Sequence, residues 1–331
     1  MIPHESAADA PARDGVPPPG IVTLTMNPAI DVTTSVARVV PDIKLRCEAP
    51  GYEAGGGGVN VARAIRRLGG DVLALFPAGG PAGALLGRLL GGEGVRYRCL
   101  PITGWTRQNV NVGEPSTGRQ FRFVMPGPCL AEPEWHPVLD ALEALEPPPR
   151  FLVASGSLPP GVPTDFYARL ARSCRRRGIA LVVDAAGEPL RQALAEGVYL
   201  LKPSLHEFEE LMGEHDCEEP RLEELGRGLI DKGRCDVLVL SLGARGVLWM
   251  SMTEGGRLIP PAVPVKSSVG AGDSVVAGIV WSLVSGRLLA DAVRFGVAAG
   301  AASVMNPGTE LCRAADVERL YTEVVAAPRR R

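Results

Sequence analysis

A short run in the last third of the chain combines an anion-binding turn with a carboxylate. The run Gly270-Ala271-Gly272-Asp273 precedes apolar residues 275–283, a stretch long enough for a helix. Glycines permit a tight turn, and the unpaired N–H groups of a first helical turn, backed by the helix dipole, bind anions. Asp273 could take the proton of a hydroxyl that attacks a phosphate, so the run predicts phosphoryl transfer. Taken alone, it could also be a helix start that Asp273 merely caps.

A second glycine-rich run, residues 55–58, enters an amphipathic helix that ends at Gly69. It is not a Walker A loop, because no Gly-Lys-Ser/Thr follows, and it fits a dinucleotide fingerprint poorly, because the glycine spacing breaks at Asn60. Each glycine costs about 1 kcal/mol against alanine, so a strand-to-helix junction with four of them indicates close approach of a ligand. Asn60 can both donate and accept hydrogen bonds, which favours a ligand with several hydroxyls.

Asp31 is a candidate for binding such hydroxyls. The β-branched and apolar residues 21–25 predict a buried strand, and Pro28 disfavours a helix at Asn27. The chain should therefore turn and present Asp31 near a strand end, where ligands of α/β sheets bind. A simple turn aspartate is the alternative.

Four cations lie on segments that alternate polar and apolar residues. Residues 44–47 predict an exposed strand with Lys44 and Arg46 on one face, and residues 105–112 and 119–125 predict a hairpin that carries Arg107 and Arg122. Together these segments form a small inserted sheet whose apolar face and edges need cover. It should close over the active site, pair with a second subunit, or do both, and its cations would either bind a phosphate or merely solvate the sheet.

The rest of the chain alternates strands and helices. Short apolar runs end at Pro77, Ala154, Asp184, Leu201 and Leu240, and helical patterns separate the later ones. This alternation predicts one doubly wound, largely parallel sheet in a single α/β domain at residues 21–325. Residues 1–20 and 326–331 are predicted tails, and the inserted lid strands should lie at about 31–52 and 104–126.

The bulk composition excludes several function classes. Acidic and basic residues nearly cancel, 37 against 35, so nothing indicates nucleic-acid binding. No apolar run of about 18 residues predicts a membrane span, and the first 20 residues do not have the pattern of a secretory signal. The seven cysteines are scattered and odd in number, which predicts reduced thiols and a cytoplasmic protein.

The motifs together resemble the ribokinase-like, PfkB-type carbohydrate kinases. In order along the chain these are TMNPAID, GGGGVNVARAIRRLGG, WTRQN, SGSLPPG, SLGARG and VGAGDS. The likeness spans nearly everything from Ile21 to Tyr321, and WTRQN and RFVMPG mark the 6-phosphofructokinase branch most sharply. It implies a three-layer α/β/α sandwich with a small β lid that also forms a homodimer interface. It implies phosphorylation of fructose 6-phosphate by ATP at the 1-hydroxyl, with tagatose-6-phosphate or fructose-1-phosphate kinase as the alternative.

The resemblance assigns roles to individual residues. Asp273 would be the base and Gly270, Ala271 and Gly272 the anion hole. The sugar would contact Asp31, Gly56, Gly57, Asn60 and Ser157, and its phosphate would contact Lys44, Arg46, Arg107 and Arg122. ATP would lie along Lys202, Ser204, Ser241, Gly243 and Gly246, with Mg²⁺ organised through water by Glu207. A loop for a monovalent cation such as K⁺ would contain Ser267, Val269, Ser303, Asn306 and Gly308.

Two positions depart from the family pattern. Ser204 stands where the metal motif usually has asparagine, and Glu310 stands where an arginine is expected beside the cation loop. These departures bear on Mg²⁺ and K⁺ dependence. A sugar-phosphate-binding regulator without catalysis is a distant alternative, which the retention of Asp273 with both glycines of the turn disfavours.

Overall fold

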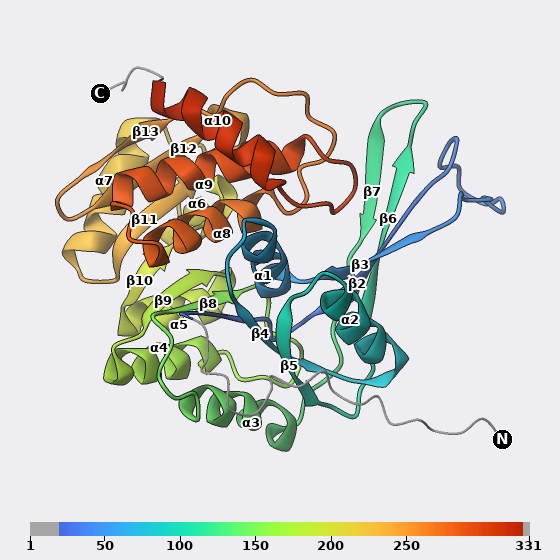
Figure 1. The fold of residues 1–331 in the computed structure, drawn as a ribbon, viewed down its shortest axis with the longest axis horizontal. Coiled ribbons are helices and arrows are strands. Elements are labelled where there is room, and N and C mark those ends of the chain that lie inside the picture. The colour runs from blue at the N-terminus through green and yellow to red at the C-terminus, as the bar shows by residue number, and fades with distance from the viewer. Residues whose placement is uncertain (1–19, 327–331) are drawn as a thin grey trace.

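The computed structural model describes residues 20–326 and has a large, mostly parallel sheet at its centre (Figure 1). Its nine strands run in the order β13-β12-β11-β10-β9-β8-β1-β4-β5. Neighbours from β11 to β5 pair in parallel, and β12 and β13 add an antiparallel edge. The strands are β1 Ile21–Leu24, β4 Leu73–Ala78, β5 Arg96–Pro101, β8 Phe151–Ser155, β9 Ala180–Asp184, β10 Val198–Leu201, β11 Cys235–Ser241, β12 Val247–Ser251 and β13 Gly255–Leu258.

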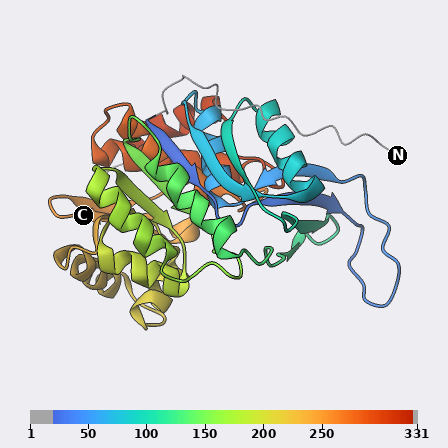
Figure 2. The same ribbon diagram turned by 90° about the horizontal axis from the view of Figure 1, so that it is seen from below.

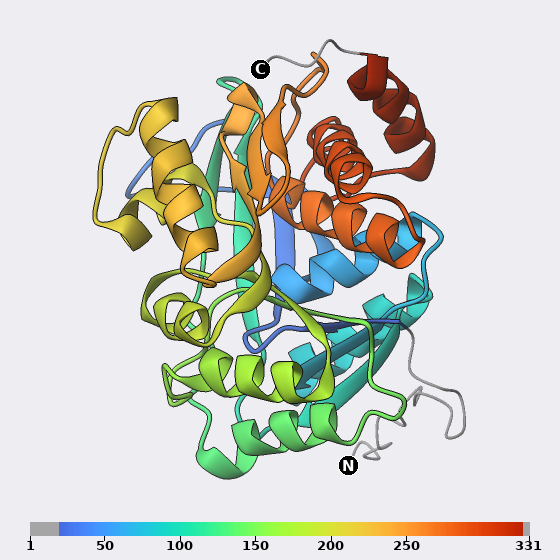
Figure 3. The same ribbon diagram turned by 90° about the vertical axis from the view of Figure 1, so that its left-hand side faces the viewer.

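Helices cover both faces of this sheet, because its buried strands are apolar on both sides. In β8, Val153 packs in one core with α1, α2, α8, α9 and α10, whereas its neighbour Leu152 packs in the other core with α3 to α7. Figures 2 and 3 show the two helix layers on opposite sides of the sheet. The predicted three-layer α/β/α sandwich is confirmed. The helices are α1 Gly57–Arg67, α2 Gly80–Gly92, α3 Glu132–Glu143, α4 Phe166–Arg177, α5 Gly187–Glu196, α6 Leu205–Met212, α7 Glu219–Asp231, α8 Ala271–Val284, α9 Leu289–Val304 and α10 Ala314–Ala326.

A separate four-stranded sheet, here called the lid sheet, stands beside the main body (Figure 1). Its order is β3-β2-β6-β7, from β2 Ala29–Ser35, β3 Gly51–Gly55, β6 Arg107–Glu114 and β7 Arg119–Phe123. The hairpin of β6 and β7 was predicted. The strand predicted at residues 44–47 was wrong, because β2 pairs with β6 on one side and β3 on the other. Residues 36–50 instead form a long loop that projects from the body (Figure 2).

Two elements were not predicted from sequence. Strand β5 is a sheet edge whose polar and apolar residues alternate, and it pairs with β4 alone. Helix α3 carries Pro133 in its first turn, which tolerates proline, and Pro137 in its interior, where proline is disfavoured. Of the predicted tails, residues 1–19 and 327–331 lie outside the described part of the chain. Within residues 20–326, every helix is too short or too polar to cross a bilayer.

Candidate active site

The turn before α8 brings Asp273 against the glycine-rich entry to α1. Gly270 precedes the helix with a φ of 72°, in the left-handed region that favours glycine. Asp273 lies in the first turn of α8, and its Oδ2 accepts a hydrogen bond of 3.0 Å from Asn60 Nδ2. These residues are 213 positions apart. The fold therefore joins the two glycine-rich runs at one carboxylate.

The pKa of Asp273 is raised from 3.8 to about 7. Burial is the largest cause, and the charge of Asp184 adds to it. The hydrogen bond from Asn60, the charge of Lys202 and a hydrogen bond from Ser155 lower the pKa but do not cancel the shift. A carboxyl that titrates near neutral pH is suited to general-base chemistry.

Lys202 and Asp184 form a buried ion pair next to this carboxyl. The Nζ of Lys202 lies 3.2 Å from Asp184 Oδ1, and the lysine side chain is 5% exposed. Burial works to lower the pKa of Lys202, but Asp184 and the other nearby carboxylates raise it overall. Asp184 ends β9 and Lys202 follows β10, so the parallel pairing of these strands places them together. Asp184 was recognised only as a strand end, and its role was missed.

The glycine turn between β3 and α1 makes a close backbone approach. A Cβ at Gly57 would lie 2.1 Å from Ser155 Oγ, so no larger residue fits there without displacement. Gly56 has a φ of 106°. The turn therefore packs directly against the carboxyl end of β8, as expected for a segment that lines a ligand site.

Asp31 is the third residue of β2, which begins right after the predicted turn, and not the end of β1 as expected. Its side chain is buried, and Asn109 Nδ2 donates a 2.9 Å hydrogen bond to its Oδ1. Burial raises the pKa of Asp31, and the bond from Asn109 opposes this. Asn109 was not singled out from sequence, although it lies in the WTRQN motif. The hydrogen bond from Asn109 holds the Asp31 carboxylate near the start of β2 in the lid sheet.

The predicted cations fall into two groups. Arg107 is anchored, because its Nη1 donates to the carbonyl of Met125 (2.9 Å) and its Nη2 to that of Asn27 (2.8 Å), whereas its Nε is buried without a partner. Burial lowers the pKa of Arg107. Asn27 in turn donates to Ser157 Oγ at 3.2 Å. Arg107 and Ser157 are therefore both bonded to Asn27, in the turn before β2.

The other three cations lie further out. Arg122 is exposed on β7 and its Nη2 is 3.4 Å from Ser268 Oγ. Lys44 and Arg46 are exposed on loop 36–50, which projects from the body (Figure 2).

The predicted metal residues Ser204 and Glu207 form a capping box at the start of α6. Glu207 Oε2 accepts from the Ser204 backbone N–H at 2.7 Å, and Ser204 Oγ accepts from the Glu207 N–H at 3.3 Å. Ser241 ends β11 and bridges to Ser204, and its buried Oγ has no hydrogen-bond partner. Gly243 and Gly246 follow in the next turn. Within residues 20–326, no group of three or more His, Cys, Asp or Glu side chains is placed to hold a metal ion.

The residues of the predicted cation loop are brought together beside the Gly270 turn. Ser267 Oγ donates to the carbonyl of Gly308 at 2.6 Å and accepts from the Val269 N–H at 3.2 Å. The Asn306 N–H bonds to the carbonyl of Ser303, whose own Oγ is buried without a partner. An unpartnered buried hydroxyl at the end of α9 fits an oxygen ligand of a cation. Glu310 instead pairs with Arg313 at 2.7 Å.

Known proteins are similar to this chain in sequence and architecture. The family model described as pfkB family carbohydrate kinase matches residues 21–316. ATP-dependent 6-phosphofructokinase isozyme 2 of Mycobacterium tuberculosis is 47% identical, over 94% of this chain and 91% of that protein. Phosphofructokinase-2 from Escherichia coli, solved in complex with potassium, is 40% identical, with a TM-score of 0.89 over 92% of this chain and 99% of that chain. A ribokinase from Arabidopsis thaliana, 19% identical over 92% of this chain and 99% of that chain, shares the fold with a TM-score of 0.72.

Proposed function

The chain belongs to the pfkB family of carbohydrate kinases, and from this premise we propose that it transfers the terminal phosphoryl group of ATP to the 1-hydroxyl of fructose 6-phosphate. The products are ADP and fructose 1,6-bisphosphate. The observation that carries the proposal is the contact of Asp273 with Asn60, because it joins an anion-binding helix start to a turn suited to sugar hydroxyls. A carboxyl with a pKa of about 7 in this place supports its role as the base.

In the reaction, the 1-hydroxyl attacks the terminal phosphorus in line with the leaving oxygen of ADP. A bond forms between O1 and phosphorus, the bond to the β,γ-bridging oxygen breaks, and the hydroxyl proton passes to Asp273. The backbone N–H groups of Gly270, Ala271 and Gly272 stabilise the charge on the transferring group. Lys202 contributes a fixed positive charge nearby, because a Cβ at Gly272 would lie only 3.3 Å from its Nζ.

The sugar lies between the glycine turn and the lid sheet. Asp31, held by Asn109, accepts hydrogen bonds from hydroxyls, and Gly56, Gly57 and Asn60 complete that side. The Nε of Arg107 is buried without a hydrogen-bond partner, and the guanidinium would supply a cation for the 6-phosphate. Ser157, Arg122, Lys44 and Arg46 remain proposed contacts of the substrate.

Two metal ions complete the proposal. Mg²⁺ neutralises the phosphate charge of ATP when it is bound, and Glu207 is the side chain that would hold its water shell beside Ser204. The nucleotide continues along Ser241, Gly243 and Gly246. The loop of Ser267, Val269, Ser303, Asn306 and Gly308 would hold K⁺ and thereby order the backbone that leads into the anion hole.

The lid sheet also supports a homodimer. Phe123, Val124 and Met125 are consecutive large apolar residues exposed at the end of β7, and Tyr52 is exposed on β3 at the other edge of the sheet. Exposed apolar surface of this kind marks an interaction site. Phe123→Glu should shift the protein from dimer to monomer in sedimentation-velocity runs. The exposed thiols at Cys47 and Cys129 support placing the reaction in the reducing cytoplasm.

The decisive experiment measures ADP release with a panel of fructose 6-phosphate, tagatose 6-phosphate and fructose 1-phosphate. We expect the highest kcat/KM with fructose 6-phosphate. Release with another member of the panel but not with fructose 6-phosphate would overturn the substrate assignment. Binding of fructose 6-phosphate without any ADP release would instead favour a sugar-phosphate-binding regulator.

A further inference from the structure

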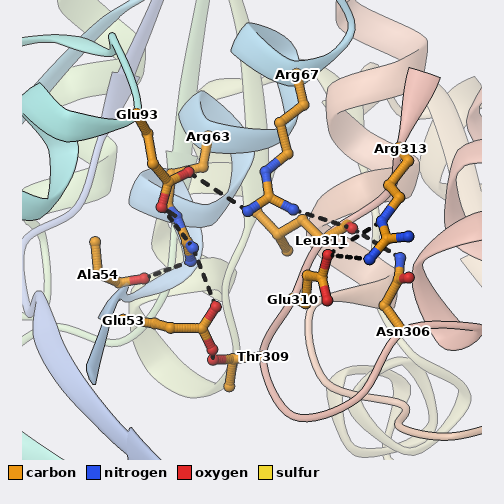
Figure 4. A network of polar contacts seen from close by, with 10 residues as sticks. All are labelled: Glu53, Ala54, Arg63, Arg67, Glu93, Asn306, Thr309, Glu310, Leu311 and Arg313. Atoms are coloured by element: carbon orange, nitrogen blue, oxygen red, sulfur yellow. Dashed lines mark hydrogen bonds and ion pairs between the residues drawn. The ribbon is translucent and has the colours of Figure 1, made fainter. Parts of the chain in front are cut away.

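Arg63 is a fully buried cation that the proposed chemistry does not use. It lies on α1, one helical turn after Asn60, and its side chain is 1% exposed. Its Nη1 donates to the carbonyl of Ala54 (2.7 Å), its Nε to Glu93 (2.8 Å), and its Nη2 lies 3.4 Å from Glu53 Oε1 (Figure 4). A buried guanidinium needs such partners, and here they fix the orientation of two carboxylates.

The two carboxylates differ in what else they contact. Glu53 lies in β3, directly opposite Asp31 in the register of the lid sheet, and its Oε2 accepts a hydrogen bond from the Thr309 hydroxyl (Figure 4). Glu93 caps the end of α2, and its Oε2 lies 3.6 Å from Nη2 of Arg67, whose Nη1 donates to the carbonyl of Leu311 (Figure 4). Both glutamates are similarly exposed, at 27% and 28%.

Thr309 belongs to the loop between α9 and α10, which contacts the segment that leads into the anion hole. It is buried, and it follows Gly308, whose carbonyl accepts from Ser267 Oγ. The same Ser267 oxygen accepts from the N–H of Val269, the residue before Gly270. Three hydrogen bonds and the peptide bond between Gly308 and Thr309 therefore connect the strand beside Asp31 to the start of the turn proposed to bind the transferring phosphate.

Other contacts between the lid sheet and this loop are weaker. Gln120 Nε2 lies 3.4 Å from the carbonyl of Lys266, and Arg122 Nη2 lies 3.4 Å from Ser268 Oγ. Both are long and exposed, so they contribute little. The contact of Glu53 with Thr309 has a buried partner and a charged acceptor, which makes it the strongest polar connection of the set.

We propose that Glu53 is a positioning residue that ties the lid sheet to Thr309 and so sets the sugar site relative to the anion hole. Asp31 lies in β2 of the lid sheet, whereas Asp273 and the Gly270 turn belong to the main body. A hydroxyl must lie close to both for in-line transfer, and small misplacements cost large factors in rate. The inference rests on the proposed kinase activity, although the tie itself is independent of which sugar is the substrate.

The test is a double-mutant cycle of Glu53→Gln and Thr309→Val, with Glu93→Gln as the matched control and Thr309→Ser as the conservative variant. We expect each single variant to lower kcat/KM for the sugar phosphate by about 10-fold, on the scale of one charged hydrogen bond. The double variant should be no worse than either single one, since both remove the same contact. The kcat/KM of Glu93→Gln should stay within about 2-fold of the wild-type value. Thr309→Ser keeps the hydroxyl and should retain the wild-type kcat/KM.

Hydrogen exchange supplies a readout that does not depend on turnover. Amides of β3 and of residues 306–309 should exchange faster in both tie variants of the full chain and at the wild-type rate in Glu93→Gln. Equal losses in Glu53→Gln and Glu93→Gln would show that only the charge balance of Arg63 matters, and would overturn the proposal. Additive losses in the double variant, or unchanged exchange in the tie variants, would also overturn it. If the wild-type protein turned over none of the sugar phosphates in the panel, the proposed function would be refuted. The hydrogen-exchange data would still test the contact between Glu53 and Thr309.

Discussion

The substitution Asp273→Asn should weaken catalysis and strengthen the fold at the same time. The amide keeps the size of the carboxylate and can still accept the hydrogen bond from Asn60 Nδ2, so the local geometry is retained. It cannot take a proton from the sugar hydroxyl. We expect ADP release at saturating substrates to fall by at least about 10²-fold, the scale of losing a general base.

The stability gain follows from the direction of the pKa shift. The pKa of Asp273 rises from 3.8 to about 7 on folding, mainly through burial and the charge of Asp184. Between these values the folded state binds more protons than the unfolded state, so stability falls as pH rises, and above pH 7 the deficit is complete. The difference corresponds to an upper limit of about 4 kcal/mol. Asparagine carries no charge and avoids this cost.

Urea unfolding at pH 4 and pH 8 measures the effect. The Asn variant should match the wild type near pH 4 and unfold at higher urea at pH 8. Asp291→Asn is the control, because Asp291 also lies in a first helical turn but is 41% exposed and paired with Arg294. Equal unfolding midpoints of wild type and Asp273→Asn at pH 8 would refute the burial argument. Near-wild-type turnover of that variant would refute the assignment of the base.

Three further substitutions probe the surroundings of the base. Arg107→Ala should raise KM for the sugar phosphate by about 10- to 100-fold, on the scale of charged hydrogen bonds, and an effect confined to KM for ATP would contradict the phosphate assignment. Lys202→Met leaves the buried carboxylate of Asp184 without its cation, so urea unfolding should show that the free energy of unfolding falls by about 3–5 kcal/mol. An unchanged unfolding midpoint would argue against the ion pair. Gly57→Ala should lower kcat by about 10²-fold, because its Cβ would collide with Ser155 Oγ, and a wild-type rate would show that the turn can shift freely.

Much of the fold could be predicted from sequence, because its main elements are strongly patterned. The buried strands β1, β4, β8, β9, β10 and β11 are short apolar runs, and the helices between the later ones have clear periodicity. The error at residues 44–47 has a simple cause. Alternation is necessary for a half-exposed strand but does not supply a pairing partner, and β2 already has partners on both sides.

The site was predicted in part. Asp273 and Asn60 were both expected to act, and the structure places them 3.0 Å apart. Asp184 and Asn109 were missed, because neither lies in a glycine-rich turn and each acts through a residue on a neighbouring strand. Arg107 was expected to bind a phosphate, yet two of its nitrogen atoms already donate hydrogen bonds to backbone carbonyls. Contacts of this kind depend on strand pairing and cannot be read from local spacing.

The sequence by itself determined the family and predicted the chemistry and the proposed base, since a glycine turn, a helix start and a carboxylate are contiguous in the chain. Only the tertiary structure decided how that base is tuned and positioned. The pKa of Asp273 depends on Asp184 and Lys202 at the ends of two other strands, and the tie from Glu53 to Thr309 joins residues 256 positions apart. Burial and charge act through space, so their partners are set by the packing of the sheet and not by the order of residues.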